Sequence, residues 1–300
     1  MKKTMLSKVR TYLAHRRALG FQLKSEGLRL LEFARYADAL GHRGPLTTRL
    51  ALNWACLPKS ADHLYRARRL EIARTFAKHL VLTEPQTQIP PRHLLGPAHR
   101  RRSPPLYSSA QLPQLLRRAG QLKGQLRPHT WQTLIGLLAC SGLRISEAMR
   151  LKPGDVDWKQ SLLIIRASKY GKTRLVPLPR SALEPLRAYA RRRQASFPLA
   201  EYFFVSDRGT RLAHSTVGET FSQLRKGIPY CRRPPRLHDL RHTMASQVLQ
   251  RWQSSRKGAV NHILILSRFL GHSNVEDTYW HLTALPQLLA EAAQRFAVNE

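Results

Sequence analysis

Apolar residues in roughly the first eighty positions recur with the period of an α-helix, about 3.6 residues, rather than with the alternation of a strand. This spacing predicts helices at four places: residues 6–19, 25–40, 47–54 and 61–82. In the second, Leu28, Leu31, Ala34 or Tyr36, and Leu40 are expected on or near one face. In the fourth, Phe76 and Leu80 face inward, and the opposite face is lined with arginines. The N-terminal region is therefore expected to be helical.

Prolines recur through residues 83–105, and a basic run at residues 99–102 lies within the same stretch. A helix cannot continue through such a segment, because proline lacks the backbone N–H and restricts the residue before it. We therefore divide the chain into an N-terminal helical domain of residues 1–82, a linker of residues 83–105 and a C-terminal domain of residues 106–300.

The C-terminal domain combines helical patterns with one strand pattern. Residues 130–141, TWQTLIGLLACS, are apolar on nearly all sides, which predicts a buried helix that ends at Gly142. Residues 161–168 and 173–179 alternate apolar and polar positions on either side of KYGK, which is typical of a β-hairpin. Helical patterns return after the hairpin and again from His238. The expected fold class is mainly α with a small antiparallel β-hairpin or sheet.

Charge then narrows the class of partner. Lys and Arg number 51 against 18 Asp and Glu, which gives a net charge of +33 spread along the chain. Such a charge attracts polyanions and releases counterions when phosphates are contacted, so nucleic acid is the expected partner. Hydrophobic residues make up 42% of the chain, enough for a packed core. This content argues against the alternative, a histone-like or ribosomal protein whose partly disordered chain is held by charge.

The cysteines Cys56, Cys140 and Cys231 are odd in number and far apart, which indicates neither a disulfide framework nor a zinc site. The chain has no HExxH, no paired CxxC and no dense carboxylate cluster, so neither a metal nor another cofactor is expected. The basic N-terminus lacks the apolar run of a signal peptide, and no stretch is apolar for long enough to span a bilayer. We expect a cytoplasmic protein without a membrane partner.

The candidate chemistry is concentrated near the C-terminus. HDLRH at residues 238–242 is followed by FLGHS at 269–273 and DTYWH at 277–281. Transfer of a phosphodiester without a metal needs fixed cations for the phosphate oxygens, a nucleophile and a proton donor for the leaving oxygen. Arginine suits the first role because its planar fork binds two oxygens at once, and histidine and lysine suit proton handling.

Four segments in order, SGLRISEAMRL, SKYGKTRLVPLP, LHDLRHTMAS and FLGHSNVEDTY, resemble those of the tyrosine recombinases, the phage integrase family. The resemblance covers essentially the whole chain and implies a helical core-binding domain followed by a mixed α/β catalytic domain. It implies a bacterial, nucleoid-associated recombinase that cleaves and rejoins DNA through a covalent 3′-phosphotyrosyl bond, without metal or ATP, in integration or transposition. It also implies binding to inverted half-sites on double-stranded DNA, as a homo- or hetero-oligomer from dimer to tetramer.

The resemblance assigns roles to single residues. Arg144 and Arg241 look like the two arginines that clamp the scissile phosphate, and Glu147 looks like the structural partner that holds Arg144. Lys169, in the hairpin, looks like the general acid that protonates the departing 5′-oxygen. Lys172 lies close enough in sequence to be the alternative.

The histidines and the nucleophile complete the expected set. His238 and His272 look like hydrogen-bonding partners of the phosphate, with His238 also helping to move the nucleophile's proton, whereas His242 is expected to pack beneath them. The family's attacking tyrosine falls two positions after Tyr279, at His281. Three interpretations remain: Tyr279 attacks, His281 attacks, or the chain has lost cleavage and is a DNA-binding subunit beside active relatives.

Basic residues outside this set are candidates for DNA contacts. They lie on the fourth N-terminal helix, in the linker and in the hairpin: Arg66, Arg68, Arg69, Arg74, Lys78, Arg100, Arg101, Arg102, Lys172 and Arg174. The span between His242 and Phe269 is longer than in compact family members and is expected to reach DNA or a neighbouring subunit. The family resemblance also implies that a C-terminal helix over residues 286–296 docks on a neighbour.

Overall fold

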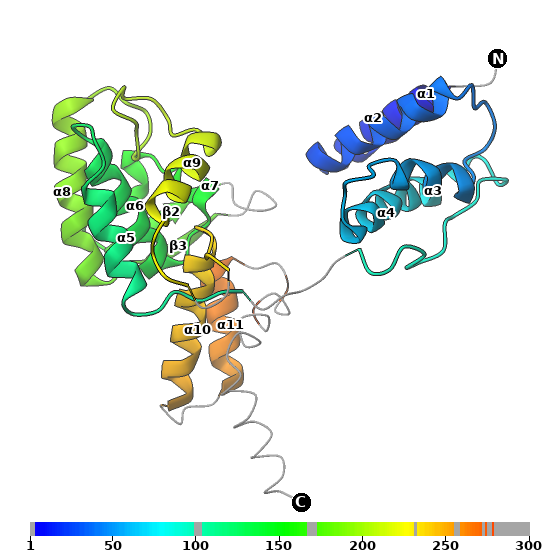
Figure 1. Ribbon diagram of the computed structural model, residues 1–300. Coiled ribbons are helices and arrows are strands. Elements are labelled where there is room, and N and C mark those ends of the chain that lie inside the picture. The colour runs from blue at the N-terminus through cyan, green and yellow to red at the C-terminus, as the bar shows by residue number, and fades with distance from the viewer. Residues whose placement is uncertain are drawn as a thin grey trace, which may run out of the picture. The chain divides into compact units, whose positions relative to one another are not determined.

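The computed structural model describes residues 4–98, 104–166, 173–230, 233–254 and 259–271, together with Asn274 and Thr278. Its internal contacts divide the chain into two units, Met1–Arg102 and Ser103–Glu300, which are described separately below (Figure 1). The division falls within the stretch expected to be a linker.

The first unit is helical, as the apolar period predicted. Its helices are α1 (Met5–Ala18), α2 (Lys24–Ala39), α3 (Thr48–Cys56) and α4 (His63–Leu80) (Figure 1). Three of them begin at a side chain that accepts a hydrogen bond from a backbone N–H of the first turn: Thr4 for α1, Thr47 for α3 and Asp62 for α4. Such caps satisfy N–H groups that have no partner inside the helix, which explains why the helices start where they do.

The buried face of α2 matches the expected one only in part. Ala34 is buried, and Leu31 and Tyr36 pack against the core while partly exposed. Leu28 and Leu40 are 65% and 61% exposed, whereas Leu30, Phe33 and Ala37 are buried. α2 packs against α1, α3 and α4, and small residues such as Ala37 allow those helices to approach closely. The buried face of α2 is therefore rotated from the expected one, away from Leu28 and toward Leu30 and Phe33.

Part of the expected linker is packed onto the first unit. The N–H of Gln88 donates to the carbonyl of Leu46 at 2.8 Å. Arg74 donates to the carbonyl of Pro90, and Arg68 to the carbonyl of Ala98. Prolines lack a donor but keep their carbonyl acceptor, so arginines on α4 can hold a proline-rich segment against the helix. Residues 83–98 therefore pack with the helical unit, although the sequence alone indicated a linker from residue 83.

The second unit is mainly helical and contains one small sheet. Its helices are α5 (Gln111–Gly120), α6 (Arg127–Ser141), α7 (Ile145–Ala148), the 3₁₀-helix η1 (Pro153–Asp155), α8 (Arg180–Ser196), α9 (His214–Leu224), α10 (Asp239–Ser254) and α11 (Ala259–Leu270). Its strands are β1 (Val156–Asp157), β2 (Leu162–Ile165) and β3 (Arg174–Pro177). The fold class expected from sequence, mainly α with a small antiparallel sheet, is confirmed.

The sheet has the order β1-β2-β3, and both pairs of strands are antiparallel. Val156, Leu163 and Val176 lie opposite one another across the three strands, and all three are buried. The predicted hairpin is thus confirmed in β2 and β3, while its turn at residues 167–172 lies outside the described residues. One apolar face of the sheet fixes the register, because a slip by one residue would expose it.

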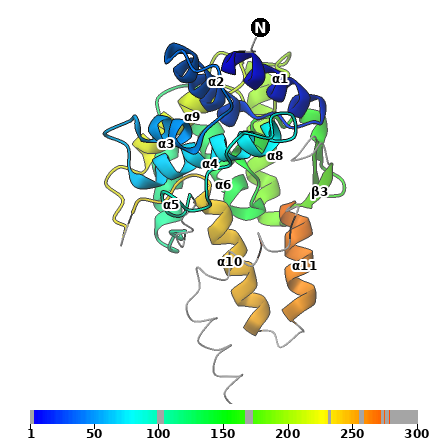
Figure 2. The same ribbon diagram turned by 90° about the vertical axis from the view of Figure 1, so that its right-hand side faces the viewer.

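α6 lies at the centre of the second unit, as its apolar sequence predicted, between α5 and α8 (Figure 1). α10 also packs on α6, and α10 and α11 lie side by side, projecting from the unit as a helical pair (Figure 2). The apolar residues of this pair form a small core of their own that includes Met244, Leu249, Leu266 and Leu270. Among the described residues, none of the helices combines the length and apolar character needed to cross a bilayer.

Candidate active site

The site begins where α6 ends. Gly142 has φ +59°, and a Cβ there would meet the side-chain ends of Met244 on α10 and Leu270 on α11. Glycine is favoured here because the left-handed backbone strains any other residue. The turn leads directly into α7 and places Arg144 at its N-terminus.

Arg144 is held at one end and open at the other. Its backbone N–H donates to Oε2 of Glu147 at 2.9 Å, and its Nη1 donates to Oε1 at 3.0 Å. Nη2 donates to the carbonyl of Gly271 at 3.3 Å. A guanidinium has five N–H groups, so these side-chain bonds leave donors for an anion, and the side chain is 26% exposed. Glu147 as the structural partner of Arg144 is confirmed.

Glu147 has a second and closer partner in Arg174. The two side chains form a bidentate pair, with Nη1 to Oε1 at 2.9 Å and Nη2 to Oε2 at 2.8 Å. Burial alone would raise the pKa of Glu147, but the hydrogen bonds and charges of Arg174 and Arg144 outweigh it and lower the pKa to about 2. Arg174 also donates from Nε to the carbonyl of Phe269 at 3.1 Å, and its side chain is 12% exposed. The fork of Arg174 thus faces a buried carboxylate, which disfavours the direct DNA contact that stays a prediction for this residue.

Arg241 lies in the first turn of α10 and is buried, with 2% of its surface exposed. Its Nη1 donates to the carbonyl of Gly142 at 2.6 Å, and its Nη2 donates to the carbonyl of Leu270 at 2.7 Å. Burial, together with the nearby charge of Arg144, lowers the pKa of Arg241. A cation held under such conditions is stabilised by any anion that arrives beside it.

The three arginines meet at the C-terminus of α11. Arg174, Arg241 and Arg144 each donate to one of three successive carbonyls, those of Phe269, Leu270 and Gly271. Carbonyls at the end of a helix have no partner within the helix and carry partial negative charge, so guanidinium donors suit them. With Glu147 included, three positive charges and one negative charge give the cluster a net charge of +2. This cluster, Arg144, Glu147, Arg174 and Arg241, is called the arginine cluster below.

Two histidines lie beside the arginine cluster. His238 immediately precedes α10, and its ring meets the His242 ring edge-on with the centroids 5.1 Å apart. Desolvation, followed by the charge of Arg241, lowers the pKa of His238. Desolvation and the proximity of His238 lower the pKa of His242 to about 4. Both rings are therefore neutral at pH 7, so each has one N–H donor and one nitrogen that accepts a proton.

The low pKa of His242 predicts a pH-dependent stability. Its pKa in the unfolded chain is about 6.5, so between pH 6.5 and 4 the unfolded state binds more protons and stability falls on acidification. We expect His242→Gln to remove on the order of 2 kcal/mol of that loss. The measurement is urea unfolding at pH 7, 5.5 and 4.5, with the exposed His63→Gln as the matched control. Parallel pH profiles for the wild type and His242→Gln would contradict the prediction.

Several expected site residues lie outside the described parts of the chain: Lys169, Lys172, His272, Tyr279, His281, Arg100, Arg101 and Arg102. The structure brings together Arg144, Arg241 and His238, three of the six residues expected to act on the phosphate. His242 packs against His238, as predicted. The sequence analysis missed the carbonyls at the end of α11, although the glycine in FLGHS indicated that a helix ends there.

The basic row on α4 is only partly free to face DNA. Arg66 donates to the carbonyls of Pro58 and Lys59. Arg69 is buried, donates to the carbonyl of Trp54 and lies with its guanidinium carbon 3.9 Å from the centroid of the Trp54 ring. This burial disfavours the DNA contact that stays a prediction for Arg69. These acceptors lie in the last turn of α3 and in the loop before α4, and the arginines supply their donors. Arg68 and Lys78 remain exposed.

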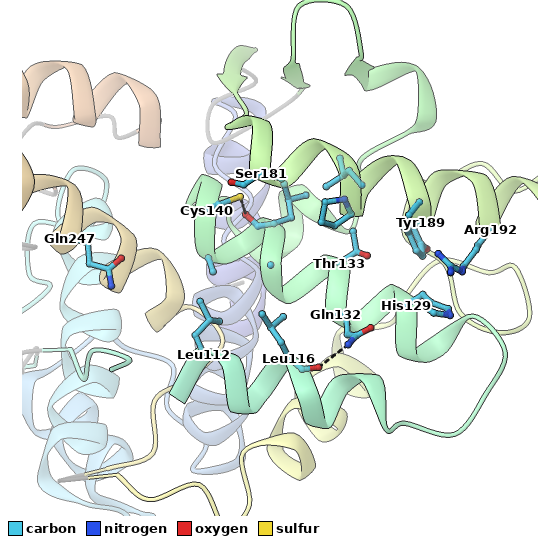
Figure 3. Close-up of a pocket in the computed structure, with 17 residues that line it drawn as sticks. Leu112, Leu116, His129, Gln132, Thr133, Cys140, Ser181, Tyr189, Arg192 and Gln247 are labelled. Atoms are coloured by element: carbon cyan, nitrogen blue, oxygen red, sulfur yellow. Dashed lines mark hydrogen bonds between the residues drawn. The ribbon is translucent and has the colours of Figure 1, made fainter. Parts of the chain in front are cut away.

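The second unit also contains a cavity of about 660 Å³ between α5, α6 and α8 (Figure 3). Its lining is largely apolar, with His129 and Arg192 toward one end and Cys140 and Ser181 toward the other (Figure 3). It shares no residue with the arginine cluster, so this cavity is separate from the candidate anion site. In the described parts of the chain, no group of His, Cys, Asp and Glu is arranged to hold a metal ion.

Known proteins provide independent comparisons. The family model described as phage integrase family matches residues 108–285. The chain is 39% identical over 304 aligned positions to the integrase/recombinase y4rB of Sinorhizobium fredii, covering 97% of this chain and 96% of the relative.

Two solved structures extend the likeness. The Tn1549 transposon integrase in complex with transposon right end DNA aligns with a TM-score of 0.72 and 17% identity, covering 98% of this chain and 100% of that chain. A lambda integrase tetramer bound to a Holliday junction aligns with a TM-score of 0.61 and 16% identity, covering 92% and 77% of the two chains. At these identities the structural likeness shows a shared fold.

Proposed function

Because this chain belongs to the phage integrase family of tyrosine recombinases, we propose that it cleaves and rejoins DNA through a covalent 3′-phosphotyrosyl intermediate during movement of a mobile element. The observation that carries the proposal is the convergence of Arg144 and Arg241 at the end of α11. The two side chains come from different helices far apart in sequence, yet they share one helix terminus. Their combined charge would bind a phosphate beside it.

The arginines would act on the scissile phosphate by electrostatic stabilisation. Negative charge builds on the non-bridging oxygens as the phosphorus becomes five-coordinate, and fixed guanidinium donors stabilise that state more than the starting diester. Both arginines are anchored by protein acceptors, Arg144 by Glu147 and Gly271, and Arg241 by Gly142 and Leu270. Anchoring reduces the reorganisation that accompanies the reaction, which is how such donors become effective.

Proton transfer completes the proposed step. The phenolic oxygen of Tyr279 attacks phosphorus, the bond from phosphorus to the 5′-oxygen breaks, and Lys169 protonates the departing oxygen. Neutral His238 accepts the phenolic proton or passes it on, in keeping with its lowered pKa. The phosphotyrosyl ester keeps the energy of the broken bond, and a 5′-hydroxyl of the partner strand reverses the step without ATP.

The partner proposed for this chain is double-stranded DNA with inverted half-sites, bound by a dimer to tetramer. The net charge of +33 supports a polyanionic partner. The solved structures with the same fold include a transposon integrase in complex with DNA and a lambda integrase tetramer on a Holliday junction. They support both the DNA partner and the oligomer.

A second candidate function rests on one residue. The family's attacking tyrosine corresponds by register to position 281, which is histidine in this sequence. A chain without a nucleophile would keep the arginine cluster and bind DNA as a non-cleaving subunit beside active relatives. Attack by His281 itself is the remaining alternative, since histidine can form a phospho-intermediate.

Covalent capture distinguishes these functions. The protein is incubated with nicked duplexes of randomised sequence, and adducts that survive denaturant are isolated and their DNA is sequenced. We expect an adduct with the wild type and with His281→Ala, and its loss, by at least roughly 10³-fold, in Tyr279→Phe. Loss in His281→Ala instead would assign the attack to histidine. No adduct with the wild type but a gain in His281→Tyr would establish the DNA-binding subunit.

A further inference from the structure

We propose that Arg174 is a positioning residue, which keeps Arg144 available for a DNA phosphate by neutralising Glu147. The inference rests on the proposed function, since it takes Arg144 to contact a phosphate. It also replaces the direct DNA contact that the sequence had suggested for Arg174. Glu147 is the centre of the inference, because it lies between the two arginines.

The geometry separates the two arginines by role. Arg174, on β3, uses all three of its nitrogens on protein acceptors: both Nη atoms on Glu147 and Nε on the carbonyl of Phe269. Arg144 gives Glu147 a single side-chain bond from Nη1. The side chain of Arg144 is 26% exposed and that of Arg174 is 12% exposed. The bidentate partner of the carboxylate is therefore the arginine with less access to a ligand.

Removing Arg174 would change how Glu147 pairs with Arg144. The Glu147 side chain is only 2% exposed, so its charge must be paired within the protein. Without Arg174, Arg144 is the remaining arginine bonded to the Glu147 carboxylate, and a bidentate pair between the two is the favourable geometry. That pair would consume donors that would otherwise face the phosphate. It would also reduce the net charge of the arginine cluster from +2 to +1.

Arg174 also holds the C-terminus of α11, where the arginine cluster meets. Its Nε holds the carbonyl of Phe269, next to the carbonyls of Leu270 and Gly271 that receive Arg241 and Arg144. A Cβ at Gly271 would lie 2.9 Å from Nη1 of Arg174, so the helix terminus and this arginine are in close contact. One side chain thus connects the sheet, the carboxylate and the end of α11.

The test compares Arg174→Met with the double variant Arg174→Met/Glu147→Gln. The double variant has the same net charge as the wild type and no carboxylate to compete for Arg144. The readout is the salt dependence of binding to an intact 40-base-pair duplex of fixed sequence, which reports the number of phosphates contacted. Arg187→Met, which removes an exposed arginine paired with Glu184 on α8, is the matched control for loss of one charge.

We expect the slope of log Kd against log salt concentration to fall by about one in Arg174→Met and to return to the wild-type value in the double variant. Arg187→Met should leave the slope unchanged. A fall of about one in both the single and the double variant would mean that Arg174 contacts DNA itself. An unchanged slope in the single variant would mean that Arg174 has no effect on Arg144. Either result overturns the proposal.

Two further measurements keep the outcome interpretable. Thermal unfolding checks that each variant is folded, and if Arg174→Met is not, Arg174→Gln takes its place. Glutamine also removes the positive charge that neutralises Glu147, so an unchanged slope with Arg174→Gln would likewise overturn the proposal. Binding to intact DNA does not require cleavage. A wild type that binds but forms no covalent adduct would therefore refute the proposed strand cleavage and leave the role of Arg174 decided by the slopes.

Discussion

Arg241→Met is expected to reduce strand cleavage by on the order of 10³-fold, the loss typical for removing a fixed cation or oxyanion donor. Arg241 is 2% exposed and bridges the carbonyls of Gly142 and Leu270. Its loss would remove positive charge from the phosphate and leave both carbonyls without this donor. The same change should therefore destabilise the second unit by about 2–4 kcal/mol.

The measurement is single-turnover covalent capture on a nicked duplex, at a temperature where circular dichroism shows the variant to be folded. Arg187→Met is the control, because Arg187 is exposed, pairs with Glu184 on α8, and contacts the carbonyl and the ring of Trp158. Arg241→Lys should recover little, since one ammonium cannot bridge two carbonyls and an anion. A cleavage rate within tenfold of the wild type in Arg241→Met would contradict the assignment of Arg241 to the phosphate.

Trp54→Ala is expected to have the largest effect on stability, about 3–5 kcal/mol, because Trp54 is among the largest fully buried side chains of the first unit. Its ring packs edge-on against Phe33, with centroids 5.2 Å apart, and the guanidinium of Arg69 lies 3.9 Å from its centroid. Truncation would open a cavity and leave the cation–π contact of Arg69 without its ring. For a unit of this size, the melting temperature should fall by roughly 15–25 °C.

Calorimetry of the full chain would show this fall in the transition of the first unit and leave that of the second unit in place. Leu82→Ala is the matched control, because Leu82 is apolar, lies in the same unit and is 77% exposed. Coincident shifts of both transitions would show that the two units unfold together. A shift below about 5 °C would contradict the packing described for Trp54.

The helices were largely predictable because their signals are local. The period of apolar residues indicated α1 to α4 within a few residues, and the alternation around KYGK indicated the strands β2 and β3. The rotation of α2 was not predictable in this way. Leu28 and Leu30 are both leucines, and only contacts with α1, α3 and α4 decide that Leu30 is buried and Leu28 exposed.

The candidate site was likewise predictable from the sequence only in part. The spacing of HDLRH and LRISE, read through the family resemblance, identified Arg144, Arg241 and His238 as candidates. It did not distinguish an arginine that faces a ligand from one that faces the protein. Arg69 and Arg174 belong to basic stretches in the sequence, yet Arg69 donates to the carbonyl of Trp54 and Arg174 pairs with Glu147.

The sequence by itself determined the class of partner, the order of the elements and the residue types available for phosphate chemistry. Net charge depends only on composition, and apolar period and motif spacing depend only on residues close together in the sequence. The tertiary structure alone decided which arginines are occupied by carbonyls and buried carboxylates and which retain donors. The physical reason is that a guanidinium binds whichever acceptors the packing leaves without partners. At the end of α11 those acceptors meet Arg144, Arg174 and Arg241 from three separate elements.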